Sequence, residues 1–317
     1  MTNQNKTFND NVHYLYSEFT HQYLQEDIGV DFTMASNSKD IFIGTILEED
    51  NDLIQFDHKL KEKTRVSIDG EVVVLQLIKD VILIGTSTGK VYRGPFNALE
   101  QIAKFENEIT SVVLLNSGLA VAYTSGIAII DEDGKIAWTL ECEAVFLDVF
   151  DNRLLFVMDN KPDTNVSVIS IDTHDILYTI PLNGEAKSIA IHPKEPLALF
   201  CTNSEIQFHD LRSGLLATWK AEENQSYERL KWNPYVATQF FFTTGSQIHL
   251  IDLAKIDSEF VDDDCDMGPE FVSSHVTFDN NVSDFAVFPI KGKQKFGVVA
   301  IDSEQMQRYA IHPELLE

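Results

Sequence analysis

Short apolar runs alternate with polar turn residues along this chain. Clear examples are Val81–Ile84, Leu119–Tyr123 and Phe240–Phe242, each bounded by Gly, Asn, Asp, Ser or Thr within a few residues. Runs this short, rich in β-branched and aromatic residues and flanked by turn formers, predict strands rather than helices. The pattern therefore predicts an all-β chain.

The strands recur with a period of about forty residues. At five positions an apolar residue, or once a histidine, precedes an Asp at the end of a strand: Phe56-Asp57, Ile130-Asp131, Ile171-Asp172, His209-Asp210 and Ile251-Asp252. The spacings are 74, 41, 38 and 42 residues, and the first is two periods with a strand but no Asp at Val91–Gly94. A repeat of this length, built from four short strands, is typical of a β-propeller.

The period predicts one seven-bladed β-propeller domain over residues 1–317, with four-stranded blades. The predicted blades cover 28–69, 70–107, 108–143, 144–183, 184–224, 225–279 and 280–317, and an acidic loop at 257–271 interrupts the sixth. The last blade lacks a fourth strand. Because an open sheet edge invites pairing with other chains, we expect residues 12–24 to close that blade as a strand. Helical spacing of apolar residues in 12–24 keeps a helix as the alternative.

The fifth and sixth predicted blades carry motifs of a known family. Ile191-His192-Pro193, the strand at 197–200 and the stretch from Phe208 to Gly214 resemble a WD-repeat, and Lys231-Trp232-Asn233-Pro234 is similar. Phe56, Ile130, Ile171, His209 and Ile251 stand where that family usually has Trp, and no Gly-His pair is found. The resemblance implies a non-enzymatic scaffold.

Composition narrows the class of protein further. Apolar residues make up 44% of the 317, which is enough for a large core. Cys142, Cys201 and Cys265 are odd in number and widely spaced, which predicts neither disulfides nor a zinc site. The N-terminus has no apolar segment typical of a signal peptide, and no apolar run is long enough to span a bilayer. We therefore expect a cytoplasmic or nuclear location, in a reducing compartment.

The charge is strongly negative and is predicted to be uneven. Fifty acidic against twenty-four basic residues give −26, a field that repels nucleic acid and anionic membranes and attracts basic partners. The resemblance to WD-repeat propellers implies that the loops between second and third strands and those between blades share one face. We assign twenty acids and Lys161 alone to this face, and fourteen acids with fourteen bases to the other, the 257–271 loop excluded. A merely soluble surface would intersperse the signs.

The acidic face predicts a binding site for a basic protein or peptide. Its candidate residues are Glu48, Glu49, Asp50, Asp52, Asp69, Glu106, Glu108, Glu141, Glu143, Asp159, Glu185, Glu205, Glu222 and Glu223.

Signatures of catalysis and of cofactor binding are missing from the sequence. The histidines show no metal-ligand spacing, and no nucleophile or phosphate-loop motif is present. Gly85–Lys90 lies between two strands, so we interpret it as a hairpin turn. His209 occupies a core-like position and is interpreted as a buried imidazole. We therefore expect no catalytic residue, no metal and no cofactor.

Three functions remain open at this point. The first is a chaperone or assembly factor that captures a Lys/Arg-rich segment of a basic client, such as a ribosomal protein or a histone. The second is a scaffold subunit of a multiprotein complex that uses blade edges, the N-terminus and the 257–271 loop. The weakest is a propeller enzyme with a site in the central channel.

Overall fold

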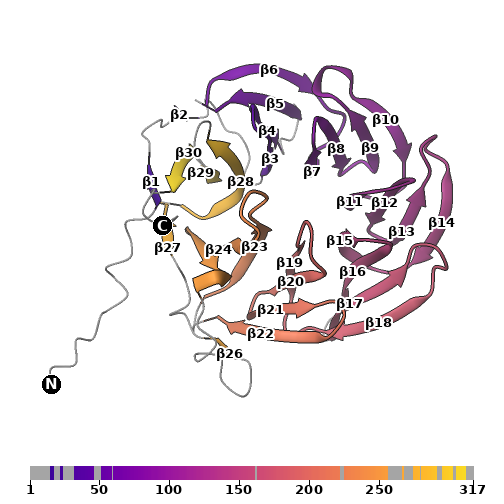
Figure 1. Cartoon of the computed structure of the whole chain (residues 1–317). Coiled ribbons are helices and arrows are strands. Elements are labelled where there is room, and N and C mark those ends of the chain that lie inside the picture. Colours follow the sequence, from indigo (N-terminus) through magenta and orange to yellow (C-terminus); the bar gives the residue numbers. More distant parts are fainter. Residues whose placement is uncertain are drawn as a thin grey trace, which may run out of the picture.

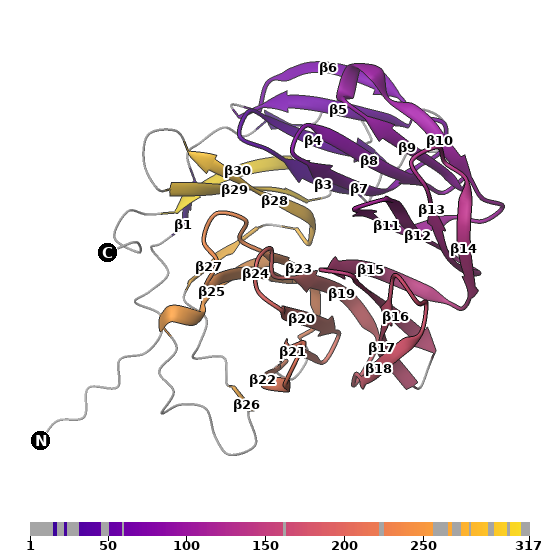
Figure 2. The same cartoon turned by 45° about the vertical axis from the view of Figure 1, so that its right-hand side comes forward.

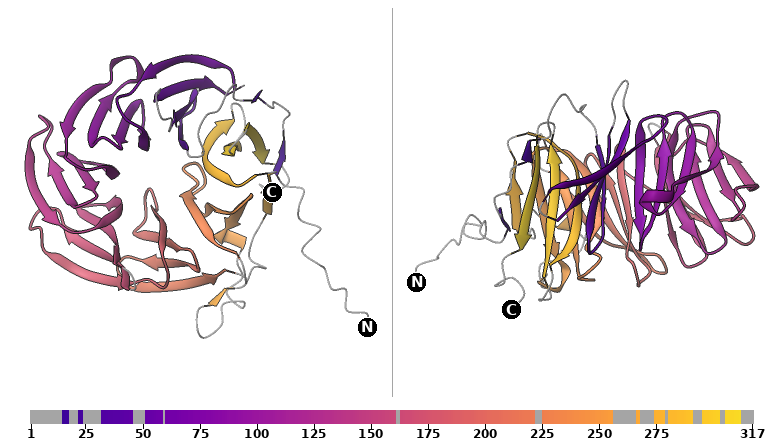
Figure 3. Two further views of the ribbon diagram at one scale, coloured as in Figure 1. Left: turned by 180° about the vertical axis from the view of Figure 1, so that it is seen from behind. Right: turned by 90° about the horizontal axis from the view of Figure 1, so that it is seen from above.

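The strands of the computed structural model form small antiparallel sheets arranged as the blades of a β-propeller (Figure 1). The structure describes residues 15–17, 22–23, 32–45, 51–58, 60–160, 163–221, 225–255, 266–267, 274–278, 280–290, 295–302 and 305–311. Figure 3 shows the ring from behind and from its side, with the chain running once around it.

Six blades have four strands in chain order, and in blade 6 a further short strand, β26 (Asp266–Met267), lies between the third and the fourth. Blade 1 contains β3 (Phe32–Ser36), β4 (Asp40–Thr45), β5 (Asp52–Asp57) and β6 (Glu62–Ser67). Blade 2 contains β7 (Val72–Ile78), β8 (Val81–Thr86), β9 (Lys90–Gly94) and β10 (Glu100–Lys104), with a 3-10 turn at Phe96–Ala98. Blade 3 contains β11 (Ile109–Leu115), β12 (Gly118–Tyr123), β13 (Gly126–Ile130) and β14 (Ile136–Glu141).

Blade 4 contains β15 (Ala144–Phe150), β16 (Arg153–Asn160), β17 (Asp163–Ser170) and β18 (Ile176–Pro181). Blade 5 contains β19 (Ala186–Ile191), β20 (Leu197–Thr202), β21 (Glu205–Asp210) and β22 (Gly214–Lys220). Blade 6 contains β23 (Tyr227–Trp232), β24 (Gln239–Thr244), β25 (Gln247–Asp252) and β27 (Ser274–Thr277), with a 3-10 turn at Leu253–Lys255.

The remaining sheet, called the closing sheet here, has only three consecutive strands: β28 (Val282–Ile290), β29 (Lys295–Asp302) and β30 (Gln305–Ile311). Two short N-terminal strands, β1 (Leu15–Ser17) and β2 (Gln22–Tyr23), both pair with β30 (Figure 1). The prediction of seven four-stranded blades is therefore wrong. The prediction completed these three strands with a full strand from residues 12–24, whereas the described residues of that segment form only two short pieces, β1 and β2. These fragments agree with the strand interpretation of 12–24, and the other residues of that segment lie outside the described residues.

Burial decreases from the second strand to the outermost one in blades 1 to 5. All six residues of β4 and of β24 are buried, whereas β6, β14 and β18 are mostly exposed. Each second strand lies inside its blade, and the neighbouring blades cover both of its faces. This explains why its sequence is an unbroken apolar run. Apolar clusters between the blades form the core, for example Phe42 and Leu53 of blade 1 with Val72 and Leu75 of blade 2.

Two glycines allow adjacent blades to approach closely. A Cβ at Gly44 would lie 2.3 Å from Val72 Cγ1, and one at Gly85 would lie 2.4 Å from Ile109 Cγ2. In both cases the side chain belongs to the next blade. Glycine in a strand interior commonly marks such an approach.

Of the predicted 257–271 loop, the structure describes only β26 (Asp266–Met267). It adds in parallel to the outer strand of blade 5, with Thr218 opposite Asp266 and Trp219 opposite Met267.

Candidate functional site

Backbone hydrogen bonds place the loops between blades beside the turns between second and third strands. The Thr124 N–H donates to Glu108 O at 3.1 Å, and the Asn203 N–H donates to Glu185 O at 2.9 Å. The side chain of Asn107 donates to Ser125 Oγ at 3.0 Å. These contacts put both loop types on one face of the ring, which we call the inter-blade face.

Four glutamates of this face are exposed and have no ion pair within the described residues. Glu106 and Glu108 lie in the loop from blade 2 to blade 3, and Glu141 and Glu143 lie where blade 3 leads into blade 4. The first loop contacts the Thr124 turn of blade 3, and Glu141 lies opposite Gly126 in the same blade. We call these four residues the acidic rim.

One residue of the acidic rim affects the pKa of a neighbouring tyrosine. Burial raises the pKa of Tyr123, and the nearby Cys142 and Glu141 raise it further. Tyr123 also stacks on Phe105, with ring centroids 4.8 Å apart. The rim therefore lies beside a packed aromatic pair.

Other predicted site residues already have partners. Asp52 is half-buried and pairs with Arg65 at 3.2 Å, and Glu185 pairs with Lys187 at 3.2 Å. Asp69 is exposed and pairs with Lys90. Glu205 is only 6% exposed and accepts a hydrogen bond of 2.7 Å from Gln207, so a partner could not reach it without local opening.

The remaining predicted site residues are only partly described or undescribed. Asp159 belongs to β16, where it lies opposite Thr164. Outside the described residues lie Glu48, Glu49, Asp50, Glu222 and Glu223.

The first strands of the blades surround a central cavity of about 890 Å³. Glu71 and Glu108 line it from the inter-blade side, and Asp148, Arg229 and Asp284 line it from the strands. The sequence analysis did not select the last three residues, although Asp148 and Asp284 each interrupt an otherwise mostly apolar first strand. That interruption is the signal by which these two could have been found.

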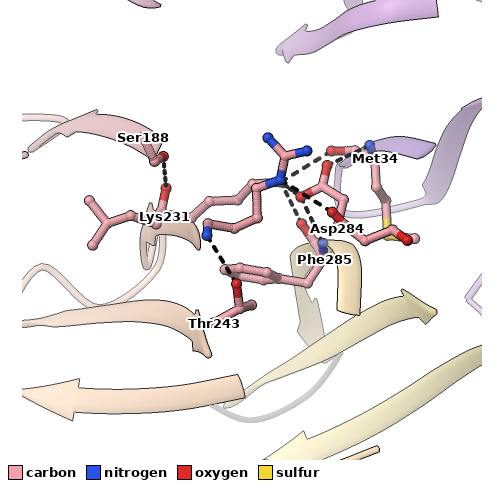
Figure 4. A network of polar contacts seen from close by, with 9 residues as sticks. Met34, Ser188, Lys231, Thr243, Asp284 and Phe285 are labelled. Atoms are coloured by element: carbon pink, nitrogen blue, oxygen red, sulfur yellow. Dashed lines mark hydrogen bonds and ion pairs between the residues drawn. The ribbon is translucent and has the colours of Figure 1, made fainter. Parts of the chain in front are cut away.

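The largest polar network in the cavity is centred on Lys231 and Asp284 (Figure 4). Lys231 Nζ lies 2.7 Å from Asp284 Oδ1 and donates to Phe285 O at 2.5 Å. The same carboxylate accepts the N–H groups of Met34 and Phe285, both at 2.8 Å. The side chain of Asp284 is 10% exposed. The network therefore joins blade 6, the closing sheet and blade 1.

Asp148 makes a similar bridge between blades 4 and 5, but without a basic residue. Its carboxylate accepts the N–H groups of Val149 at 2.8 Å and of Ile191 at 2.9 Å. Loss of hydration on burial raises the pKa of Asp148 to about 6, against the lowering effect of the two hydrogen bonds.

The two described cysteines, Cys142 and Cys201, and His209 are in surroundings typical of packed rather than reactive side chains. Burial raises the pKa of the Cys142 thiol to about 11 and raises that of Cys201 still further, so neither is a ready thiolate. His209 is buried and its Nε2 lies 2.9 Å from Gln207 Oε1, as expected for a core imidazole. Burial lowers its pKa to about 4. No group of three or more His, Cys, Asp or Glu suited to a metal ion occurs within the described ranges.

No protein-family model matches this chain, and no curated protein matches it significantly. Likewise, in the part of the chain that the structure describes, no helix has the length and apolar character needed to cross a membrane. The β-propeller arrangement is therefore the level at which the chain can be classified, and this fold commonly serves as a platform for protein interactions.

Proposed function

We propose that this chain is a non-enzymatic, WD-repeat-like propeller whose inter-blade face captures a Lys/Arg-rich segment of a protein. The observation that carries the proposal is the acidic rim. Its four carboxylates are exposed, have no described ion pair, and continue through Glu108 to the lining of the central cavity. Complementary charge of this kind chiefly accelerates association and selects the partner.

The polar groups of the cavity support binding over catalysis. The carboxylates of Asp284 and Asp148 hold backbone N–H groups of adjacent blades, and Lys231 is neutralised by Asp284. Groups used in this way hold adjacent blades together rather than being set out for proton transfer to a substrate. The proposed role is a chaperone or assembly factor for a basic client in the cytoplasm or nucleus, such as a ribosomal protein or histone. Shielding such a client would prevent its non-specific binding to nucleic acid.

Binding of a Lys/Arg-rich peptide to the parent and to a Glu106→Lys/Glu141→Lys variant tests the proposal. The parent should bind, and affinity should fall steeply with added salt because exposed charges are screened over about 8 Å at physiological ionic strength. The variant should bind at least about tenfold more weakly, mainly through slower association. Surface plasmon resonance at several salt concentrations measures both effects.

A matched control is Glu132→Lys/Glu195→Lys. Both residues are exposed in turns of the opposite face, and the pair changes the net charge by the same amount. It should retain most of the parent's affinity. Equal weakening by the two pairs would mean that total charge, rather than the inter-blade face, attracts the peptide, and the proposal would be wrong.

A further inference from the structure

Exposed aliphatic side chains gather on the outer strands of three consecutive blades. Among the described large apolar residues that are exposed, five of six lie at the starts of β14, β18 and β22: Ile136 (57%), Ile176 (61%), Leu177 (46%), Leu215 (48%) and Leu216 (39%). Ile136, Ile176 and Leu215 occupy equivalent places, each next to the β-bulge that follows the turn from the third strand. Blade 1 has Glu62 at this place.

The three strand starts are linked into one band around the ring. Trp138 of β14 stacks on His174, two residues before β18, with ring centroids 4.7 Å apart. Tyr178 of β18 donates a hydrogen bond of 2.8 Å to Leu211 O, just before β22. Figures 1 and 2 show β14, β18 and β22 following one another along the outside of the ring. Contiguous exposed apolar patches often mark interaction sites.

Within this band, β18 is an edge strand without charged residues. Its sequence is Ile-Leu-Tyr-Thr-Ile-Pro, and no described strand pairs with its outer side. By contrast, β6 has the sequence Glu-Lys-Thr-Arg-Val-Ser. Proteins protect free sheet edges with charges, with Pro or with bulges. A bulge and Pro181 give β18 some protection, but it has no charge beside its exposed aliphatic residues, which leaves its edge open to strand addition.

The neighbouring blade shows how such an edge is covered. The two residues of β26 add in parallel to β22, which is the outer strand of blade 5. A short extended segment is therefore already accommodated on the outer edge next to β18. Strand addition of this kind gains affinity from backbone hydrogen bonds and specificity from alternate side chains.

We propose that β18 is a docking edge for an extended segment of another protein, with aliphatic side chains at alternate positions that pack on Ile176 and Leu177. A second copy of this chain is a poor occupant, because two bodies of net charge −26 repel each other. A neutral or basic partner segment meets no such repulsion. This site is separate from the acidic rim and does not depend on the function proposed above.

A synthetic probe peptide tests the edge. It has Thr alternating with Val or Ile and one Lys at each end, and its control has Ser in place of every aliphatic residue. Binding is measured by fluorescence anisotropy at about 1 M salt, where screening over about 3 Å removes the contribution of the acidic rim. The aliphatic probe should bind and should slow hydrogen exchange at the amides of β18, whereas the Ser peptide should not bind.

Two variants connect the binding to this edge. Ile176→Thr/Leu177→Thr keeps strand-forming residues but removes the apolar contact, and should weaken the probe at least about tenfold. Tyr235→Thr removes an exposed aromatic residue outside the band and should bind like the parent. Circular dichroism and thermal unfolding verify that both variants are folded.

Several results would overturn the inference. They are no binding of the aliphatic probe, equal binding of the Ser peptide, or unchanged binding by folded Ile176→Thr/Leu177→Thr. Sedimentation that shows a dimer of the parent and a monomer of this variant would instead assign β18 to a second copy. The aliphatic probe should also bind to the Glu106→Lys/Glu141→Lys variant, which would show that this binding does not depend on the acidic rim.

Discussion

The junction that closes the ring and the junction between blades 4 and 5 hold adjacent sheets together with different polar contacts. Each has an apolar core, with Met34, Ile41 and Phe288 at the first and Val157, Val168 and Phe200 at the second. Each also has a first-strand aspartate that accepts an N–H of the next blade. Only Asp284, at the closing junction, has a lysine beside it. Asp148 is left with a pKa raised by burial to about 6.

The comparison indicates which junction of the ring has the additional ion pair. Blades 4 and 5 are consecutive in the chain, so a short covalent connection keeps them together. The closing sheet and blade 1 are joined across about 250 residues of sequence, as the separation between Met34 and Asp284 shows. Closing so long a loop carries a larger entropic cost, and the additional ion pair stabilises the junction at which this loop is closed.

Removing Asp284 should therefore have the largest effect. Asp284→Ala leaves the Lys231 ammonium partly buried without its carboxylate and also leaves the Met34 N–H without its acceptor. Breaking a buried pair from one side typically costs about 3–5 kcal/mol, and because Lys231 is partly exposed, the expected loss is about 3 kcal/mol. Urea unfolding measures it. Lys231→Met/Asp284→Ala should lose less than Asp284→Ala alone, and equal losses would show that the lysine is not coupled to the aspartate.

The acid sensitivity of His209 tests the junction between blades 4 and 5. His209 contacts Phe200 in the core there, with ring centroids 5.2 Å apart, and burial lowers its pKa to about 4. Because the unfolded histidine titrates near pH 6.5, its stabilisation is present above that pH and is lost as the pH falls toward 4. Between pH 7 and 5 the parent should lose about 2 kcal/mol relative to His209→Phe in urea unfolding. Parallel pH profiles would contradict the buried neutral imidazole.

Asp148 should show a smaller effect of opposite sign. Its folded pKa of about 6 lies above the unfolded value near 3.9, so the ionised form destabilises the fold at neutral pH. As the pH falls through 6, the folded protein takes up a proton and gains stability, and this gain is complete below about 3.9. Relative to Asp148→Asn, the parent should gain about 1 kcal/mol between pH 7 and 5. A difference that does not change with pH would mean that Asp148 keeps an ordinary pKa.

The regular part of the fold could be predicted from the sequence because each blade repeats one burial pattern. Second strands such as the one that contains Phe240–Phe242 are covered on both faces. Turns such as Asp131–Gly134 separate the strands of a blade. The closing sheet departs from this pattern. Its last partners, β1 and β2, are only three and two residues long, and a period of forty residues carries no information about such fragments.

The candidate site was less accessible to prediction, because the charges of loop residues do not reveal their partners. Asp52 and Glu205 look equivalent to Glu106 in the sequence, yet one pairs with Arg65 and another is buried against Gln207. Such pairing depends on register between strands and on side-chain direction. Asp284 stands out in its mostly apolar strand, but its bond to the Met34 N–H joins residues about 250 apart in the sequence, and nothing local predicts that partner.

The pairing of β1 with β30 has a consequence for synthesis of the chain. Tyr16 is made almost three hundred residues before its partner Ala310. At about 5–20 residues per second, the first strand waits roughly 15–60 s for its place in the sheet. As the intervening blades are made, the nascent chain forms an arc whose closing pair is still missing. We therefore expect its free strand edges to be open to pairing with other chains until β30 is made.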